Sequence, residues 1–293
     1  MFLSKASEVI QVCEEKGISI AEYTILEEME ATDSTREEVF ERMRDNLRVM
    51  MSSAKEAMDK EVISISGLIG GDATKLRKYA ESGNTLCGEF MVKAMARALS
   101  CSEVNAAMGR IVAAPTAGSC GILPGTIITA GERLNKTEDE MVTALFTASG
   151  VGIIIAMNAT LAGAEGGCQA ECGSAAAMGA AAVVEMMGGT PKMAFDAGAM
   201  VFKNVEGLVC DPIAGLVEIP CAKRNVAGAV SALTMADLAM AGVESKIPFD
   251  DTVASMYKIG KNLPMELRET ALGGLAMTPC GQRLRDKVLG KNN

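Results

Sequence analysis

Residues 142–164, VTALFTASGVGIIIAMNATLAGA, form the stretch of sequence that decides the fold. It runs for 23 positions without a charged side chain, which is long enough to cross a bilayer. However, Thr147 and the helix-weakening Gly150 and Gly152 interrupt it, and no Lys or Arg anchors flank it. Small residues let helix backbones approach closely. The stretch therefore predicts a buried central helix of a soluble protein rather than a membrane span.

Charged residues are unevenly distributed around this stretch. Residues 111–243 hold 18 of them in 133 positions, whereas residues 1–110 hold 33. The small-residue texture returns at 173–184 and 225–243, and only Val62–Ser66 alternates with the period of a strand. Residues 1–293 therefore predict an all-α protein, a single helical catalytic domain in which charged outer helices wrap small-residue-rich, buried central helices.

Two helix starts are marked by capping boxes. Thr137 with Glu140 opens the helix that enters the uncharged stretch, and Ser34 or Thr35 precedes Glu37 and Glu38 by three residues. In each box a hydroxyl and a carboxylate satisfy N–H groups that the first turn leaves unpaired. These positions predict where two of the longer helices begin.

Composition limits the chemistry. The chain has 293 residues, a formal charge of −9, nine Cys and no His. The negative charge argues against a nucleic-acid surface, and without His the chain supplies no imidazole as base or metal ligand. An odd number of Cys, and residues 1–17 that lack the basic start and apolar run of a secretory signal, predict a cytoplasmic protein in a reducing compartment.

A Pro- and Gly-rich loop is the first candidate site. Residues 114–126, APTAGSCGILPGT, form a tight loop before the helical pattern of 127–134. Backbone N–H groups at such a junction can hold a carboxylate or a phosphate. An ordinary helix–helix connection accounts for the pattern equally well. The loop matches neither a P-loop nor a dinucleotide fingerprint.

Four cysteines form the second candidate site: Cys168, Cys172, Cys210 and Cys221. No CxxC pair occurs, which argues against a zinc ribbon or a ferredoxin pattern. Loop-borne thiolates from separate places can still converge on a cluster. The scattered remaining cysteines are interpreted as structural: Cys13, Cys87, Cys101, Cys120 and Cys280.

Taken in order, four motifs carry a resemblance to a known family. They are PTAGSCGILPG (115–125), NATLAGAEGGCQ (158–169), CDP with VEIPC (210–212 and 217–221) and RETALGGLA (268–276). Over essentially its whole length the chain closely resembles the α chain of the iron–sulfur-dependent bacterial L-serine dehydratases, in their two-chain form.

The resemblance implies a lyase that deaminates L-serine to pyruvate and ammonia, an activity of amino-acid degradation and gluconeogenesis. It implies a 4Fe–4S cluster held by Cys168, Cys210 and Cys221, whose spacing matches the family's ligands, with one iron open as a Lewis acid. Cys172 is expected to be a neighbour only. Candidate donors to the serine carboxylate follow from the resemblance and the composition: Thr116, Ser119, Gly121 and Asn158.

The missing imidazole has its own implication. In the family a Ser-His-Thr motif belongs to the β part, so the base is expected on a separate β subunit and the active site at a subunit interface. Two rivals remain open. One is a pyridoxal-phosphate deaminase, which needs strands and a Schiff-base lysine. The other is a non-catalytic membrane or assembly subunit built on residues 142–164.

Overall fold

The computed structural model describes residues 2–290, and within that range it contains thirteen α-helices and no strand. The α-helices are α1 (Ala6–Lys16), α2 (Ile20–Thr32), α3 (Arg36–Asp59), α4 (Asp72–Glu81), α5 (Gly88–Ala106), α6 (Ile122–Arg133), α7 (Glu138–Asn158), α8 (Gly163–Gly166), α9 (Ser174–Met186), α10 (Pro191–Val205), α11 (Cys221–Met240), α12 (Phe249–Asn262) and α13 (Pro279–Val288). The shorter turns are η1 (Ala117–Ser119), the π-helix η2 (Gln169–Gly173), η3 (Ile213–Gly215), η4 (Met265–Leu267) and η5 (Gly274–Met277). The all-α prediction is confirmed.

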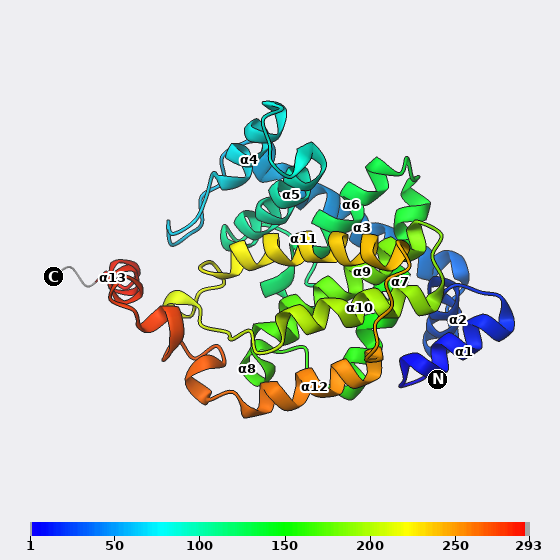
Figure 1. Cartoon of the computed structure of the whole chain (residues 1–293). Helices are drawn as coiled ribbons and strands as arrows, with labels where there is room; N and C mark the ends of the chain where they lie inside the picture. The colour runs from blue at the N-terminus through cyan, green and yellow to red at the C-terminus, as the bar shows by residue number, and fades with distance from the viewer. Residues whose placement is uncertain (1, 291–293) are drawn as a thin grey trace.

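Helix α9, SAAAMGAAAVVEM, is the centre of the core. Apart from Glu185, all of its side chains are buried, and it packs against α6, α7, α10 and α11. Figure 1 shows these helices gathered in the middle of the molecule. Alanine loses no side-chain entropy in a helix and keeps the helix narrow, so four neighbours can approach the α9 backbone closely. The prediction of small-residue-rich buried helices is confirmed here.

Helix α7 contains most of the uncharged stretch. By length and composition it is the single described helix that qualifies as a membrane span, with a mean hydropathy of 1.7, but 67% of its most apolar window is buried inside the protein. It packs against α2, α3 and α9. At Gly150 a Cβ would overlap the Thr24 hydroxyl of α2, so glycine permits the close contact. Packing within the protein therefore accounts for the apolar character of α7.

Both predicted capping boxes are present. Thr137 and Glu140 begin α7, and Thr35 with Glu38 begins α3, so Thr35 rather than Ser34 is the N-cap.

The alternating segment Val62–Ser66 does not form a strand. It makes one isolated bridge, between Ile63 and Gly70.

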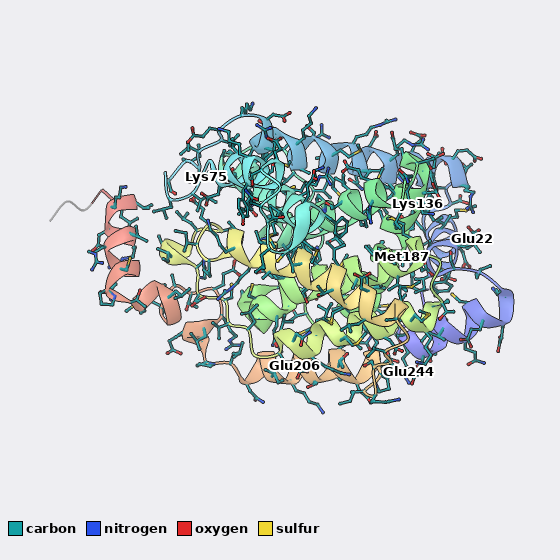
Figure 2. All side chains as sticks on the ribbon, turned by 45° about the horizontal axis from the view of Figure 1, so that its top comes forward. Glu22, Lys75, Lys136, Met187, Glu206 and Glu244 are labelled. Carbon is teal, nitrogen blue, oxygen red and sulfur yellow. The ribbon has the colours of Figure 1, made fainter. Side chains whose placement is uncertain are left out.

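Charged side chains cover the periphery. Figure 2 labels two such side chains that are exposed, Lys75 and Glu244. Helix α13 lies at the opposite end from α1 and α2 (Figure 1).

The cysteines divide by burial. Cys13, Cys101 and Cys120 are buried, whereas Cys87 and Cys280 are exposed, and all nine are free thiols.

Candidate active site

The loop that precedes α6 is held tightly against its neighbours. Ser119 is fully buried, and its hydroxyl lies 3.3 Å from the Thr116 hydroxyl. A Cβ on Gly121 would overlap the Ala98 carbonyl of α5, so only glycine allows this approach. The following helix begins at Ile122 and not near residue 127 as the sequence predicted. Pro124 is tolerated in the first turn because its missing N–H has no helical partner there.

Asn225, fully buried on the second turn of α11, fastens this loop in place. Its Oδ1 accepts from the Gly121 N–H at 2.8 Å. Its Nδ2 donates to the Gly118 carbonyl at 2.7 Å and to the Cys221 carbonyl at 3.0 Å. One amide thus connects the Thr116–Gly121 loop to the first residue of α11, which is a predicted cluster ligand. An amide suits this role because it carries both an acceptor and two donors.

Cys168 lies between α8 and the π-helix η2. Its position is fixed by Gln169, whose Nε2 donates to the Gly166 carbonyl at 2.9 Å and the Met256 carbonyl at 3.0 Å. The Gln169 Oε1 accepts from the Gly207 N–H at 2.8 Å. Gln169 is fully buried, so these bonds are shielded from water.

Cys210 is held by the C-terminal segment. Its N–H donates to the Leu267 carbonyl at 2.8 Å, and its carbonyl accepts from the Glu269 N–H at 2.7 Å. Beside it, Asp211 accepts from the Arg224 guanidinium at 2.8 Å and from the Leu275 N–H at 2.7 Å. The RETALGGLA motif therefore contributes to the site by bracing Cys210 and Asp211.

Cys221 begins α11 and is also buried. The preceding turn contains buried Glu218, which accepts from the Ser66 hydroxyl at 2.7 Å. Two residues after the cysteine, Lys223 pairs with Asp72 of α4 at 2.6 Å. Both contacts tie the start of α11 to the segment from 62 to 72.

The four site thiols act on one another electrostatically. A direct interaction with the Cys172 thiol lowers the pKa of Cys168, and the Arg224 guanidinium acts in the same direction. The same interaction and burial raise the pKa of Cys172 well above its ordinary value. Burial and the charge of Cys168 raise the pKa of Cys221 to about 12, and the same causes raise that of Cys210. Negative charge on these thiols is therefore mutually unfavourable until a cation joins them.

Glu171 is a site residue that the sequence analysis did not single out, although it lies inside the Cys168–Cys172 run. Its Oε1 accepts from the Thr116 hydroxyl at 3.0 Å, and its Oε2 lies 4.0 Å from the Cys210 sulfur. Burial raises its pKa, and the negative charge of Glu269 adds to the effect. This carboxylate joins the Thr116 loop to the cysteine region.

The predicted substrate residues divide into two groups. Thr116, Ser119 and Gly121 lie together on one loop beside Glu171. Asn158 instead lies at the exposed end of α7, and its Nδ2 donates to the Ser4 carbonyl at 2.5 Å and the Ile154 carbonyl at 2.8 Å. None of its hydrogen bonds within residues 2–290 reaches the loop.

Buried thiols are the donor type that an iron–sulfur cluster requires. No three His, Cys, Asp or Glu side chains in residues 2–290 are arranged to hold one metal ion. In a 4Fe–4S cluster each thiolate binds its own iron, so the sulfurs do not converge on one point. Cys168, Cys210 and Cys221 are buried, come from three elements and affect one another's pKa, which is compatible with that requirement. The Nε of Arg268, at the bridge to Cys210, is buried with no partner in the described residues, which suits a site that receives an anionic group.

Comparisons with known proteins show which family the chain resembles over nearly its whole length. The family described as "Serine dehydratase alpha chain" matches residues 15–276. A protein of Bacillus subtilis named "Probable L-serine dehydratase, alpha chain" is 50% identical over 97% of this chain and 94% of its own length. The "L-serine dehydratase, alpha chain" of Peptoniphilus asaccharolyticus is 48% identical over 98% of both chains. The "L-serine dehydratase" of Streptomyces coelicolor is 34% identical over 92% of this chain, which spans 60% of that longer protein.

Proposed function

The chain belongs to the serine dehydratase alpha chain family, and from that premise we propose that it is the α subunit of an iron–sulfur-dependent L-serine dehydratase. The reaction removes the Cα proton and the β-hydroxyl of L-serine. The aminoacrylate product tautomerises to the imine and hydrolyses to pyruvate and ammonia. The observation that carries the proposal is the convergence of the Thr116 loop, the Cys168–Cys172 run and the Cys210 segment on Glu171.

Cys168, Cys210 and Cys221 are the proposed ligands of a 4Fe–4S cluster. Hydroxide is a poor leaving group, and a cluster with an open iron supplies the Lewis acid that its departure requires. Arg224 supports this role from the protein side, because its charge favours the thiolate of Cys168. Asp211 holds that guanidinium in place.

The Thr116–Gly121 loop is the proposed substrate platform. The Thr116 hydroxyl donates to Glu171 and lies 3.3 Å from the Ser119 hydroxyl, and Gly121 contributes by letting the loop approach α5. The N–H of Gly121 is already bonded to Asn225, so its part is to shape the loop. Asn158 stays a prediction from the sequence, because its hydrogen bonds lead to Ser4 and Ile154.

A β subunit is the proposed partner and the source of the base. The chain contains no His. It also spans about three-fifths of the longer L-serine dehydratases, which leaves room in them for a further part. We place the activity in the cytoplasm, where nine free thiols stay reduced. No nucleic acid or membrane is part of the proposal, since the net charge is −9 and burial accounts for α7.

No specific observation favours the rival functions. A pyridoxal-phosphate deaminase needs a strand-bearing scaffold, and residues 2–290 contain no strand.

The test is an anaerobic assay of pyruvate formation from L-serine, with and without the β subunit, on the reconstituted wild-type chain. The pair is expected to be active and the isolated chain to have little or no activity. Cys168→Ala, Cys210→Ala and Cys221→Ala are each expected to lose the visible absorbance of the cluster together with activity. Cys172→Ala, the matched control, is expected to keep the cluster. Full activity of the isolated chain would refute the shared active site, and a retained cluster in any of the three ligand variants would refute that ligand.

A further inference from the structure

Glu171 lies in a space that the surrounding glycines leave open. A Cβ on Gly163 would stand 2.6 Å from its Oε2, and one on Gly118 would stand 3.1 Å from its Oε1. The Thr116 hydroxyl bonds to Oε1, and the Cys210 sulfur faces Oε2. The half-buried carboxylate is therefore the point at which the substrate loop, the α8 turn and the cysteine region meet.

This carboxylate has no cationic partner in the part of the chain that the structure describes. None of the ion pairs within residues 2–290 includes it, and the charged group that acts on it most directly is another acid, Glu269. The nearby guanidinium of Arg224 is already bonded to the Val209 carbonyl and to Asp211. Removing a carboxylate from water without a counter-charge is unfavourable. The geometry leaves a negative site that a cation of the right size would complete.

We propose that Glu171 binds the α-ammonium group of the amino-acid substrate, with the Thr116 hydroxyl fixing the orientation of the carboxylate. This inference rests on the proposed function, because it is that function which brings an α-amino acid to the Thr116 loop. An ammonium group supplies both the charge and the N–H donors that the carboxylate lacks, in a charge-assisted hydrogen bond. The Thr116 O–H is already donated to Glu171, so the loop holds the carboxylate in place and Glu171 supplies the acceptor for the ammonium group.

The assignment has a consequence for specificity. A site built around a carboxylate disfavours a ligand that has no ammonium group, since the half-buried acid then gains no counter-charge. The amine-free analogue 3-hydroxypropionate keeps the carboxylate and the β-hydroxyl of serine. It should therefore bind much more weakly than L-serine to the wild-type enzyme, and this difference should depend on Glu171.

The experiment uses the holoenzyme with its β subunit and compares Glu171→Gln with wild type. The matched control is Glu185→Gln, which makes the same change on the same helical stretch away from the site. In Glu171→Gln the KM for L-serine should rise about 30-fold, the usual size of a lost charged hydrogen bond. The inhibition constant of 3-hydroxypropionate should stay within about threefold of its wild-type value, because that ligand never used the charge. The control should keep the wild-type KM.

A second variant tests the orienting role of Thr116. In Thr116→Val the carboxylate remains and only the hydroxyl is removed, so the KM for L-serine should rise by about fivefold.

Three results would overturn the assignment. The first is an unchanged KM for L-serine in Glu171→Gln. The second is an inhibition constant for 3-hydroxypropionate that rises in parallel with that KM, which would indicate general damage to the site. The third is loss of the cluster absorbance, which would make Glu171 part of the cluster scaffold. Failure of the wild-type pair to deaminate serine is a separate outcome, and it would refute the proposed function itself.

Discussion

Two carboxylates at opposite ends of the continuous helical stretch 169–186 differ in their hydrogen-bond partners. Glu185, at the far end of α9, accepts from the Ile20 and Ala21 N–H groups at 2.6 and 3.2 Å and from the Thr147 hydroxyl at 2.5 Å. Glu171, in η2, has the Thr116 hydroxyl and a distant thiol. Burial is the leading cause of a raised pKa in both.

This difference distinguishes Glu185, a structural carboxylate, from Glu171, which has acceptor sites left for a ligand. Glu185 satisfies the unpaired N–H groups at the start of α2 and thereby fastens that helix to the core. Glu171 accepts from no helix-end N–H group among the described residues. Mutation of Glu185 should therefore change the stability of the protein, whereas mutation of Glu171 should change substrate binding.

The largest effect is expected from disrupting the hydrogen bonds of Asn225, which hold the Thr116–Gly121 loop beside Glu171. Asn225→Asp keeps the acceptor for the Gly121 N–H but removes both donors and points a charge at the Gly118 and Cys221 carbonyls. It should lower the free energy of unfolding by about 3 kcal/mol and kcat/KM by more than about 100-fold. Urea unfolding and the serine assay measure the two effects. Asn84→Asp, the same change in an exposed loop, should alter neither, and a small effect at Asn225 would contradict the positioning role.

A smaller loss of stability is expected from neutralising Asp211, which lies beside Cys210. Asp211→Asn leaves the largely buried Arg224 guanidinium without its counter-charge and should lower the free energy of unfolding by about 2 kcal/mol. It should also weaken retention of the cluster, followed by visible absorbance during anaerobic dialysis. Asp250→Asn provides the control, because Asp250 accepts from N–H groups at the start of α1, which is far along the chain from the proposed cluster ligands. Equal cluster retention in the two variants would show that Asp211 does not brace the site.

At the structural end, Glu185→Gln should act on stability alone. The amide replaces one of the two oxygens that together receive three donors by an NH2 group, so the free energy of unfolding should fall by about 1 kcal/mol. Both kcat and KM for L-serine should stay at their wild-type values. A raised KM in this variant would remove the contrast with Glu171.

The smallest effect is a pH dependence at Glu185. Because its folded pKa is raised, the folded protein keeps a proton that the unfolded chain has already released, and its contribution to stability falls as pH rises through that window. The stability advantage of wild type over Glu185→Gln should therefore shrink from about pH 5 toward neutrality. Measuring the free energy of unfolding of both proteins across this range gives the difference. Glu103 and Glu171 also have raised pKa values, but their contributions are present in both proteins and cancel. An advantage that grows with pH would mean that the charged form is favoured at this position.

Several elements were readable from sequence because their causes are local. The Thr137–Glu140 box and the uncharged run that follows it contain the signals that start α7 and bury it. The sequence pattern does not predict the start of α6 at Ile122, since Pro124 and Gly125 look like loop residues although a first helical turn tolerates them. The resemblance and the composition place Asn158 with the loop as a carboxylate donor, whereas its hydrogen bonds are to Ser4 and Ile154.

The sequence by itself determined the helical class and the buried central helices, because composition, spacing and capping act over one or two turns. Its motifs carried the family resemblance, from which the cysteine ligands are proposed. Only the tertiary structure decided that Asn225 connects the Thr116 loop to Cys221, that Asp211 binds both Arg224 and the C-terminal segment, and that Glu171 lacks the donors that Glu185 has. These are contacts between segments far apart in the chain. Whether a buried polar group is satisfied depends on what folding places beside it, and a single sequence does not record that.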